Sequence, residues 1–119
     1  MMYDQAFGEI ITARFPGSIR HVAIVLDGSF AKGPFCAVGT TDIIPEFTEK
    51  IAVNWSEEPM RSWIDDGKWP QDKGLGRFYV EFIQQVPGGT VIESVGQAPE
   101  GFAKLLLRMW HRHKKRTKP

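Results

Sequence analysis

Residues 99–119 constrain the fold more than any other part of the chain, because they combine a helical apolar stripe with a one-sided charge. The stripe recurs at i, i+3, i+4, i+7, i+8 and i+11, the spacing of one face of a helix with about 3.6 residues per turn. Its members are Phe102, Leu105, Leu106, Met109, Trp110 and His113. Pro99 and Glu100 suit the first turn, since a helix start does not use the missing proline N–H and the helix dipole favours an acid there. The segment therefore predicts a C-terminal helix that packs its stripe on the body of the protein.

The charge of the chain is divided between this body and the C-terminal segment. Residues 1–103 hold all 14 acidic residues and eight Lys/Arg, whereas residues 104–119 hold seven Lys/Arg and no acid. These seven cations are Lys104, Arg108, Arg112, Lys114, Lys115, Arg116 and Lys118. The net charge of +1 conceals this asymmetry, which indicates a partner that carries phosphates or other acidic groups. A second interpretation is that the cations only form a solvated face that complements the helix dipole.

Size and composition indicate a globular protein. With 119 residues, of which 42% are hydrophobic and 24% charged, we expect a single domain over residues 1–119, with the basic helix and tail at 99–119. The single cysteine, Cys36, lies in the apolar run 35–38, which favours a buried thiol over a nucleophile. One cysteine, no signal-peptide pattern and no apolar run of membrane-spanning length predict a soluble, cytoplasmic protein.

The first half of the chain predicts one helix and two or three strands. Helical spacing predicts a helix that ends at Pro16, with a face made of Tyr3, Phe7, Ile10, Ile11 and Phe15. The short apolar runs 21–26 and 35–38 predict two strands that pair as a hairpin. Residues 50–55 alternate as a third strand would, and although residues 43–55 also fit a helical spacing, we favour the strand.

The second half predicts a helix and two further strands before the C-terminal helix. Ser56 followed by two acids is typical of a helix start, and Gly67 ends this helix. Residues 77–86 alternate as a strand, with Phe78, Val80 and Phe82 on one face. A turn signal at 87–89 predicts that residues 90–95 form the hairpin partner of this strand.

These elements predict an α+β fold in the order α-β-β-(β)-α-β-β-α. We expect an antiparallel sheet of four or five strands with the helices packed on one face. The stripe of the C-terminal helix would then cover Phe78, Val80 and Phe82, and its cations would be held at fixed spacing.

The sequence contains no strong catalytic pattern. His111 and His113 are two residues apart, which places them on different faces of a helix, so they cannot grip one metal as an i, i+4 pair would. The glycine-containing loops lack the spacing and the Lys–hydroxyl pair of nucleotide-binding loops. We therefore expect a protein that is not an enzyme and that holds neither a metal nor a cofactor.

One fragment supports an alternative. Val25-Leu26-Asp27-Gly28-Ser29, a strand that ends in an aspartate and is followed by another strand, resembles the first-strand motif of the ribonuclease H family. The resemblance covers about ten residues. It implies a magnesium-dependent nuclease in which Asp27 helps to hold the metal ions. The family also uses a glutamate on the following helix and further aspartates, for which Glu46 or Glu49 and Asp65 are the candidates here.

Two features indicate contacts with a partner protein. The order of elements is similar to that of small secretion chaperones, which bind an unfolded partner along a sheet and a helix. Trp69 lies beside Pro70 in a glycine-flanked loop near Lys68 and Lys73, so it is a candidate to stack on a base or to fill a partner's pocket. The alternative is that Trp69 folds back onto the core.

The sequence thus favours a small non-enzymatic binding protein whose basic C-terminal helix engages nucleic acid or a nucleoprotein complex, as a regulator or inhibitor from a mobile element would. The seven cations would contact phosphates, which gives affinity with little sequence preference. One alternative is a chaperone-like or inhibitory protein whose acidic body binds a basic partner. The other is the nuclease that uses Asp27.

Overall fold

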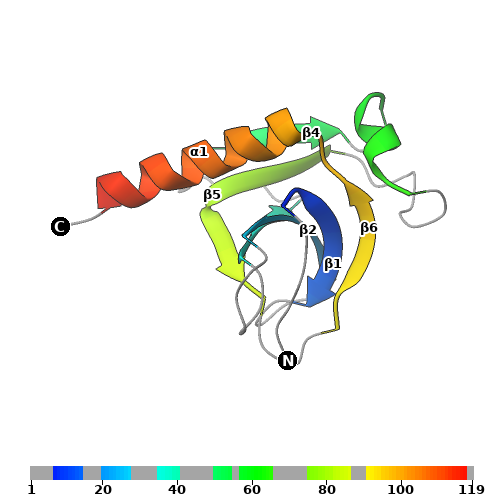
Figure 1. Cartoon of the computed structure of the whole chain (residues 1–119), viewed down its shortest axis with the longest axis horizontal. Helices are drawn as coiled ribbons and strands as arrows, with labels where there is room; N and C mark the ends of the chain where they lie inside the picture. Colours follow the sequence, from blue (N-terminus) through cyan, green and yellow to red (C-terminus); the bar gives the residue numbers. More distant parts are fainter. Residues whose placement is uncertain are drawn as a thin grey trace.

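The protein forms one curled antiparallel sheet with a long helix across it (Figure 1). The computed structural model describes residues 7–14, 20–27, 35–40, 50–54, 57–65, 75–86 and 91–117. The elements are β1 (Glu9–Arg14), β2 (Arg20–Asp27), β3 (Phe35–Thr40), β4 (Lys50–Asn54), the 3₁₀ turn η1 (Met60–Trp63), β5 (Leu75–Gln85), β6 (Glu93–Gln97) and α1 (Glu100–Thr117). The six strands lie in the order β4-β5-β3-β2-β1-β6. The α+β class is therefore confirmed, whereas the strand number and order differ from the prediction.

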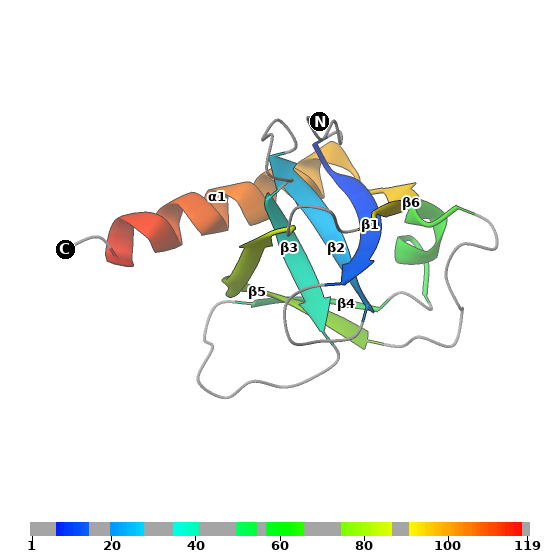
Figure 2. The ribbon, with the colours of Figure 1, turned by 90° about the horizontal axis from the view of Figure 1, so that it is seen from below.

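The curl brings the two edges of the sheet toward each other through η1, which follows the edge strand β4 (Figure 2). Just after η1, Ile64 forms a bridge with Gly96 of the opposite edge strand β6. The backbone N–H of Asp65 also donates to the carbonyl of Val95 at 2.7 Å. This bridge and this hydrogen bond join the segment after η1 to the edge strand β6 and stabilise the curled shape.

Both faces of the central strands are buried, because successive side chains of a strand point to opposite faces. On one face, Ile10 and Ile24 belong to the cluster that also contains Leu106 of α1. On the other face, Ile11 and Val25 belong to a second cluster with Cys36. In β2, for example, residues 22–26 are therefore a continuous apolar run rather than a strict alternation.

Strand β5 bends between its two halves. Ala37 of β3 pairs with Ile83, whereas Gly39, only two residues further along β3, pairs with Phe78. Such an irregularity leaves extra residues on one strand and bends it. Phe78 and Ile83 consequently face the same cluster, while Phe82 packs in the second cluster. The expectation that Phe78 and Phe82 share one face is therefore wrong, because it assumed regular alternation along the whole strand.

The helix predicted before Pro16 is wrong where the structure describes it. Residues 9–14 form β1, which pairs with β2 on one side and β6 on the other. Its apolar positions fitted a helical spacing because a strand buried on both faces is not distinguished from a buried helix by periodicity. Gly8, at φ 82°, precedes β1 and donates its N–H to the carbonyl of Val25 at 2.7 Å. The remaining residues of the predicted helix, 1–6 and 15–16, lie outside the described residues.

The other predicted elements have mixed outcomes. The hairpin of β2 with β3 and the strand at 50–54 are confirmed. The helix predicted from Ser56 is, within the described residues, only the 3₁₀ turn Met60–Trp63. The strand that follows the turn signal at 87–89 exists, but it pairs with β1 instead of β5, whose two sides are occupied by β3 and β4. The prediction paired this strand with the one that precedes it in the chain. It did not consider β1 as a partner, because residues 9–14 were predicted to be helical.

The closure of the curl predicts a specific sensitivity at Gly96. A Cβ atom added there would lie 2.0 Å from the backbone oxygen of Trp63, a contact that the flanking backbone must move to relieve. We expect Gly96→Ala to lower the free energy of unfolding by about 3 kcal/mol or more, in the range of severe overpacking. Urea denaturation followed by circular dichroism measures this change.

Gly101 provides the matched control. It lies in the first turn of α1, and nothing is within 4 Å of a Cβ added there. Gly101→Ala should therefore raise the stability by about 0.5–1 kcal/mol through helix propensity. Equal effects of the two substitutions would contradict the closure through Gly96.

Candidate functional site

The helix α1 is fixed on the sheet by one face. Ala103 and Leu106 are buried, and Leu106 belongs to the core cluster of the sheet. The ring of Phe102 lies 5.0 Å from that of Trp63 and 6.3 Å from that of Phe78, measured between centroids. The helix therefore covers Phe78 as expected, and its position on the sheet is defined by ring packing.

The buried face differs from the predicted stripe by a rotation of the helix. Leu105 is 38% exposed, although the stripe included it. Ala103 is fully buried and Leu107 packs against the core, although the stripe included neither. Apolar spacing located the helix correctly but did not fix its rotation, because leucines occupy three consecutive positions from 105 to 107.

Opposite this face, four cations form what we call the cation row. They are Lys104, Arg108, Arg112 and Lys115, and all four are exposed. With about 3.6 residues per turn, these positions fall on one side of the helix, away from Ala103 and Leu106. The last turns of α1 extend past the edge of the sheet (Figure 1 and Figure 2). The C-terminal end of the cation row is therefore accessible to a large partner.

The first cation of the row is partly neutralised. Lys104 Nζ lies 2.8 Å from the carboxylate of Glu100, one turn earlier. The hydrogen bond from Lys104, together with its positive charge, lowers the pKa of Glu100. Glu100 is the one acid of α1, so no other carboxylate of this helix neutralises Arg108, Arg112 and Lys115.

Of the remaining predicted contact residues, Lys114 is the one whose side chain the structure describes, and it is not part of this row. Lys114 lies on the sheet-facing side of α1, with its Nζ 4.4 Å from the ring centroid of Trp110. The side chain of Arg116 and the whole of Lys118 and Trp69 lie outside the described residues. Of the seven predicted phosphate contacts, the structure thus places four in the outward row and Lys114 apart from it.

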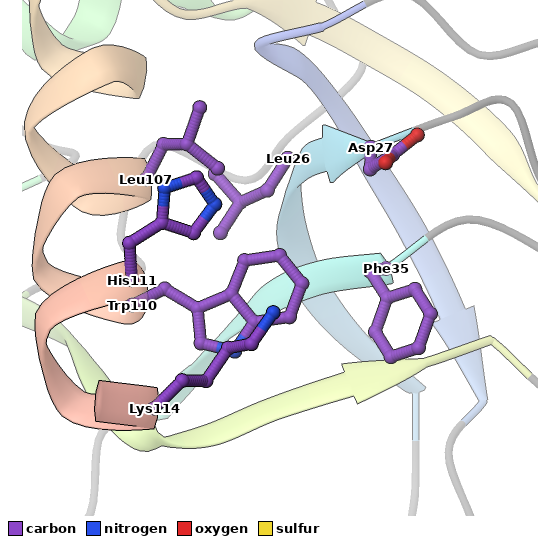
Figure 3. Close-up of a pocket in the computed structure, with 7 residues that line it drawn as sticks. All are labelled: Leu26, Asp27, Phe35, Leu107, Trp110, His111 and Lys114. Atoms are coloured by element: carbon purple, nitrogen blue, oxygen red, sulfur yellow. The ribbon is translucent and has the colours of Figure 1, made fainter. Parts of the chain in front are cut away.

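Lys114 belongs to an open pocket between α1 and the strands β2 and β3 (Figure 3). The pocket has a volume of about 580 Å³ and is lined by Leu26, Asp27, Phe35, Leu107, Trp110, His111 and Lys114. We call it the aromatic pocket. The centroids of Phe35 and Trp110 are 5.5 Å apart, and those of Trp110 and His111 are 5.9 Å apart. In Figure 3 the helix side chains reach toward Leu26 and Phe35, while the Asp27 carboxylate is directed away from the helix.

Sequence reasoning missed this pocket. Phe35 and Trp110 are 75 positions apart, and their contact depends on where α1 crosses the sheet. The sequence did contain one indication of a second apolar surface. The helix carries more large apolar residues than one buried stripe needs.

Asp27 and Asp65, the two candidates for a magnesium site that the structure describes, are not brought together. Asp27 is the last residue of β2, beside α1. Asp65 follows η1, and its backbone N–H bonds to Val95 of β6. The strands β1 and β6 therefore lie between Asp27 and Asp65 in the sheet. Glu46 and Glu49 lie outside the described residues. Among the residues that the structure does describe, no group of three or more His, Cys, Asp or Glu side chains could hold a metal ion.

The side chains of His21 and Cys36 pack within the sheet. His21 Nδ1 lies 3.1 Å from the carbonyl of Gly39, and its ring is nearly perpendicular to that of Phe82, with 6.3 Å between the centroids. Cys36 has no exposed surface. Burial, helped by the negative charge of Glu9, raises the pKa of Cys36 from 9.0 to about 12. The thiol therefore stays protonated at neutral pH, as a buried structural cysteine does.

Comparison with protein-family models, with curated protein sequences and with solved structures finds no match for this chain. Within the described ranges, no helix is both long and apolar enough to cross a membrane.

The buried thiol predicts a pH dependence of stability. Above about pH 9 the unfolded thiol ionises while the folded one keeps its proton up to about pH 12, so alkali favours the unfolded state. At pH 10.5 this linkage should lower the free energy of unfolding of the wild type by about 2 kcal/mol relative to pH 8. Urea denaturation of the wild type and Cys36→Ala across this range isolates the contribution, because the other titrating groups are common to both proteins. Parallel pH profiles would show that Cys36 is not buried in this way.

Proposed function

We propose that this protein is a small non-enzymatic binding protein that uses the cation row of α1 to engage the phosphates of a nucleic acid. The observation that carries the proposal is the alignment of Arg108, Arg112 and Lys115 on the exposed face of a helix anchored by its opposite face. An anchored helix presents these charges at fixed spacing, so binding does not require the ordering of a loose tail.

The spacing of the row suits the phosphate backbone of a nucleic acid. Arg108 and Arg112 are four residues apart, which corresponds to about 6 Å along the helix axis. Both are arginines, whose planar guanidinium groups can donate two parallel hydrogen bonds to one phosphate. Contacts of this type bind the backbone and carry no base information, so affinity should depend on salt more than on sequence.

The charge at the other end of the molecule orients the complex. Glu57, Glu58 and Asp65 are exposed around η1, which lies away from the C-terminal end of α1 (Figure 1). Their negative charge repels phosphates, so nucleic acid would approach the molecule from the C-terminal half of α1.

The same three acids favour a second candidate function. An exposed acidic end can bind a basic protein surface, including one that itself binds nucleic acid. This function needs the η1 end, so replacing Glu57 and Glu58 by Gln would weaken it and would leave binding through α1 intact or stronger.

The first test neutralises the row. We expect Arg108→Gln/Arg112→Gln to reduce the slope of log K against log salt by about 1.4 to 1.8, since each lost contact removes about 0.7 to 0.9. The same relation gives an affinity roughly 25- to 60-fold weaker at 0.1 M salt. Fluorescence anisotropy with labelled oligonucleotides of mixed sequence, between 50 and 200 mM salt, measures both quantities.

The matched control is Lys50→Gln/Arg61→Gln, which removes the same charge from two exposed positions outside α1. The control should change the slope little. If both double variants lose the same affinity and slope, net charge alone governs binding, and the cation row is not the site.

A further inference from the structure

We propose that the aromatic pocket receives one unstacked base of a single-stranded nucleic acid whose backbone lies along the cation row. This inference rests on the proposed function and adds the kind of nucleic acid that is preferred. Its basis is the position of a cavity with aromatic and apolar walls directly beside the exposed cations of the same helix.

The walls of the pocket match the surface of a base. Leu26, Phe35, Leu107 and Trp110 supply apolar and aromatic surface from three different elements (Figure 3). A volume of about 580 Å³ lies within the range of small-molecule sites. Every base has a π-face, so stacking on such a surface is strong and tolerates different sequences. The pocket therefore complements a row that has no base preference of its own.

The base would stack on the outer surface of the two rings. The centroids of Phe35 and Trp110 are 5.5 Å apart, whereas a base inserted between them needs about 7 Å, or twice the contact distance of carbon atoms. The ring planes are tilted by 32° to each other. The pair thus acts as one platform, with Leu26 and Leu107 on the pocket wall.

Lys114 links the platform to the phosphate backbone. Its ammonium lies over Trp110 at 4.4 Å, in a cation–π contact that contributes only about 0.5–1 kcal/mol at an exposed site. A base that stacks on Trp110 displaces this ammonium, and the long side chain then reaches the phosphate of the same nucleotide.

The pocket and the row are continuous along the helix. His111 lines the pocket, and it lies three residues after Arg108 and four before Lys115, which are its surface neighbours in the row. A strand can therefore pass from row to pocket within one turn of α1. A duplex keeps its bases stacked and paired, so it can contact the row but must pay several kcal/mol to place a base in the pocket.

Chemical shift mapping by NMR tests this arrangement directly. The wild-type protein is titrated with an eight-nucleotide single-stranded DNA, with a duplex of the same length and with polyphosphate, which carries charge but no bases. We expect all three to shift the side-chain signals of Arg108 and Arg112. Only the single strand should also shift the indole N–H of Trp110 and the methyl groups of Leu26 and Leu107.

A pair of tryptophan variants provides the second measurement. Trp110→Leu removes the stacking platform, and single-strand affinity should fall about 5- to 100-fold, as for the loss of one stacked base, while duplex affinity stays the same. Trp63→Leu is the control, because Trp63 is also half-buried and packs against Phe102 of the same helix but does not line the pocket. Thermal unfolding of both variants measures the structural cost of losing an indole from the core.

The outcomes separate the two proposals. Shifts at Arg108 and Arg112 without shifts at Trp110, Leu26 and Leu107 would overturn the base-binding pocket and leave the cation row in place. Equal losses in Trp110→Leu and Trp63→Leu would also overturn it. Failure of all three ligands to shift any signal of α1 would overturn the proposed function itself.

Discussion

The packing of α1 across the curled sheet is the interaction on which the rest of this structure depends. Leu106 enters the core cluster of the central strands, Phe102 contacts Phe78 and Trp63, and Trp110 contacts Phe35. These contacts span more than two turns of one helix face, so they fix both its direction and its rotation. The outward direction of the cations is a consequence of this rotation and not an independent feature.

The sheet that receives the helix is itself held by contacts between its edges. Gly96 allows the backbone of Trp63 to approach β6, and Ala98 donates its N–H to the carbonyl of Gly8 at 2.9 Å just before α1 begins. Because α1 follows β6 directly, the position of its first turn is set by these hydrogen bonds. The curl and the helix are thus coupled, and the pocket between them exists only when both are in place.

Part of this arrangement could be predicted from the sequence. The extent of α1, the pairing of β2 with β3, the strand at 50–54 and the one-sided charge all follow from local periodicity and composition. The identity of β1 could not be predicted, because burial on both faces removes the alternation that identifies a strand. The pairing of β6 with β1 could not follow once β1 had been interpreted as a helix. The bend of β5, which separates Phe78 from Phe82, depends on its non-local pairing with β3.

For the candidate site, periodicity alone places Lys104, Arg108, Arg112 and Lys115 on one face of the helix, but it does not show that Lys114 lies over Trp110. Seven cations were expected to act as one set, but Lys114 lies over Trp110 and Lys104 is bound by Glu100. Once the buried face of α1 is known, the angular position of each residue around the helix is enough to assign it to the row or to the pocket. That face could not be chosen from the sequence, since Leu105, Leu106 and Leu107 offer three competing rotations.

Amide hydrogen exchange along α1 tests most directly whether the cations are held by a docked helix. Docking through Leu106 and Trp110 predicts that the amides of residues 106–112 are strongly protected, with opening energies close to those of the central strand β2. Exchange of these amides at the rate of an unfolded peptide, while β2 stays protected, would contradict the account, because the cations would then belong to a loose tail without fixed geometry.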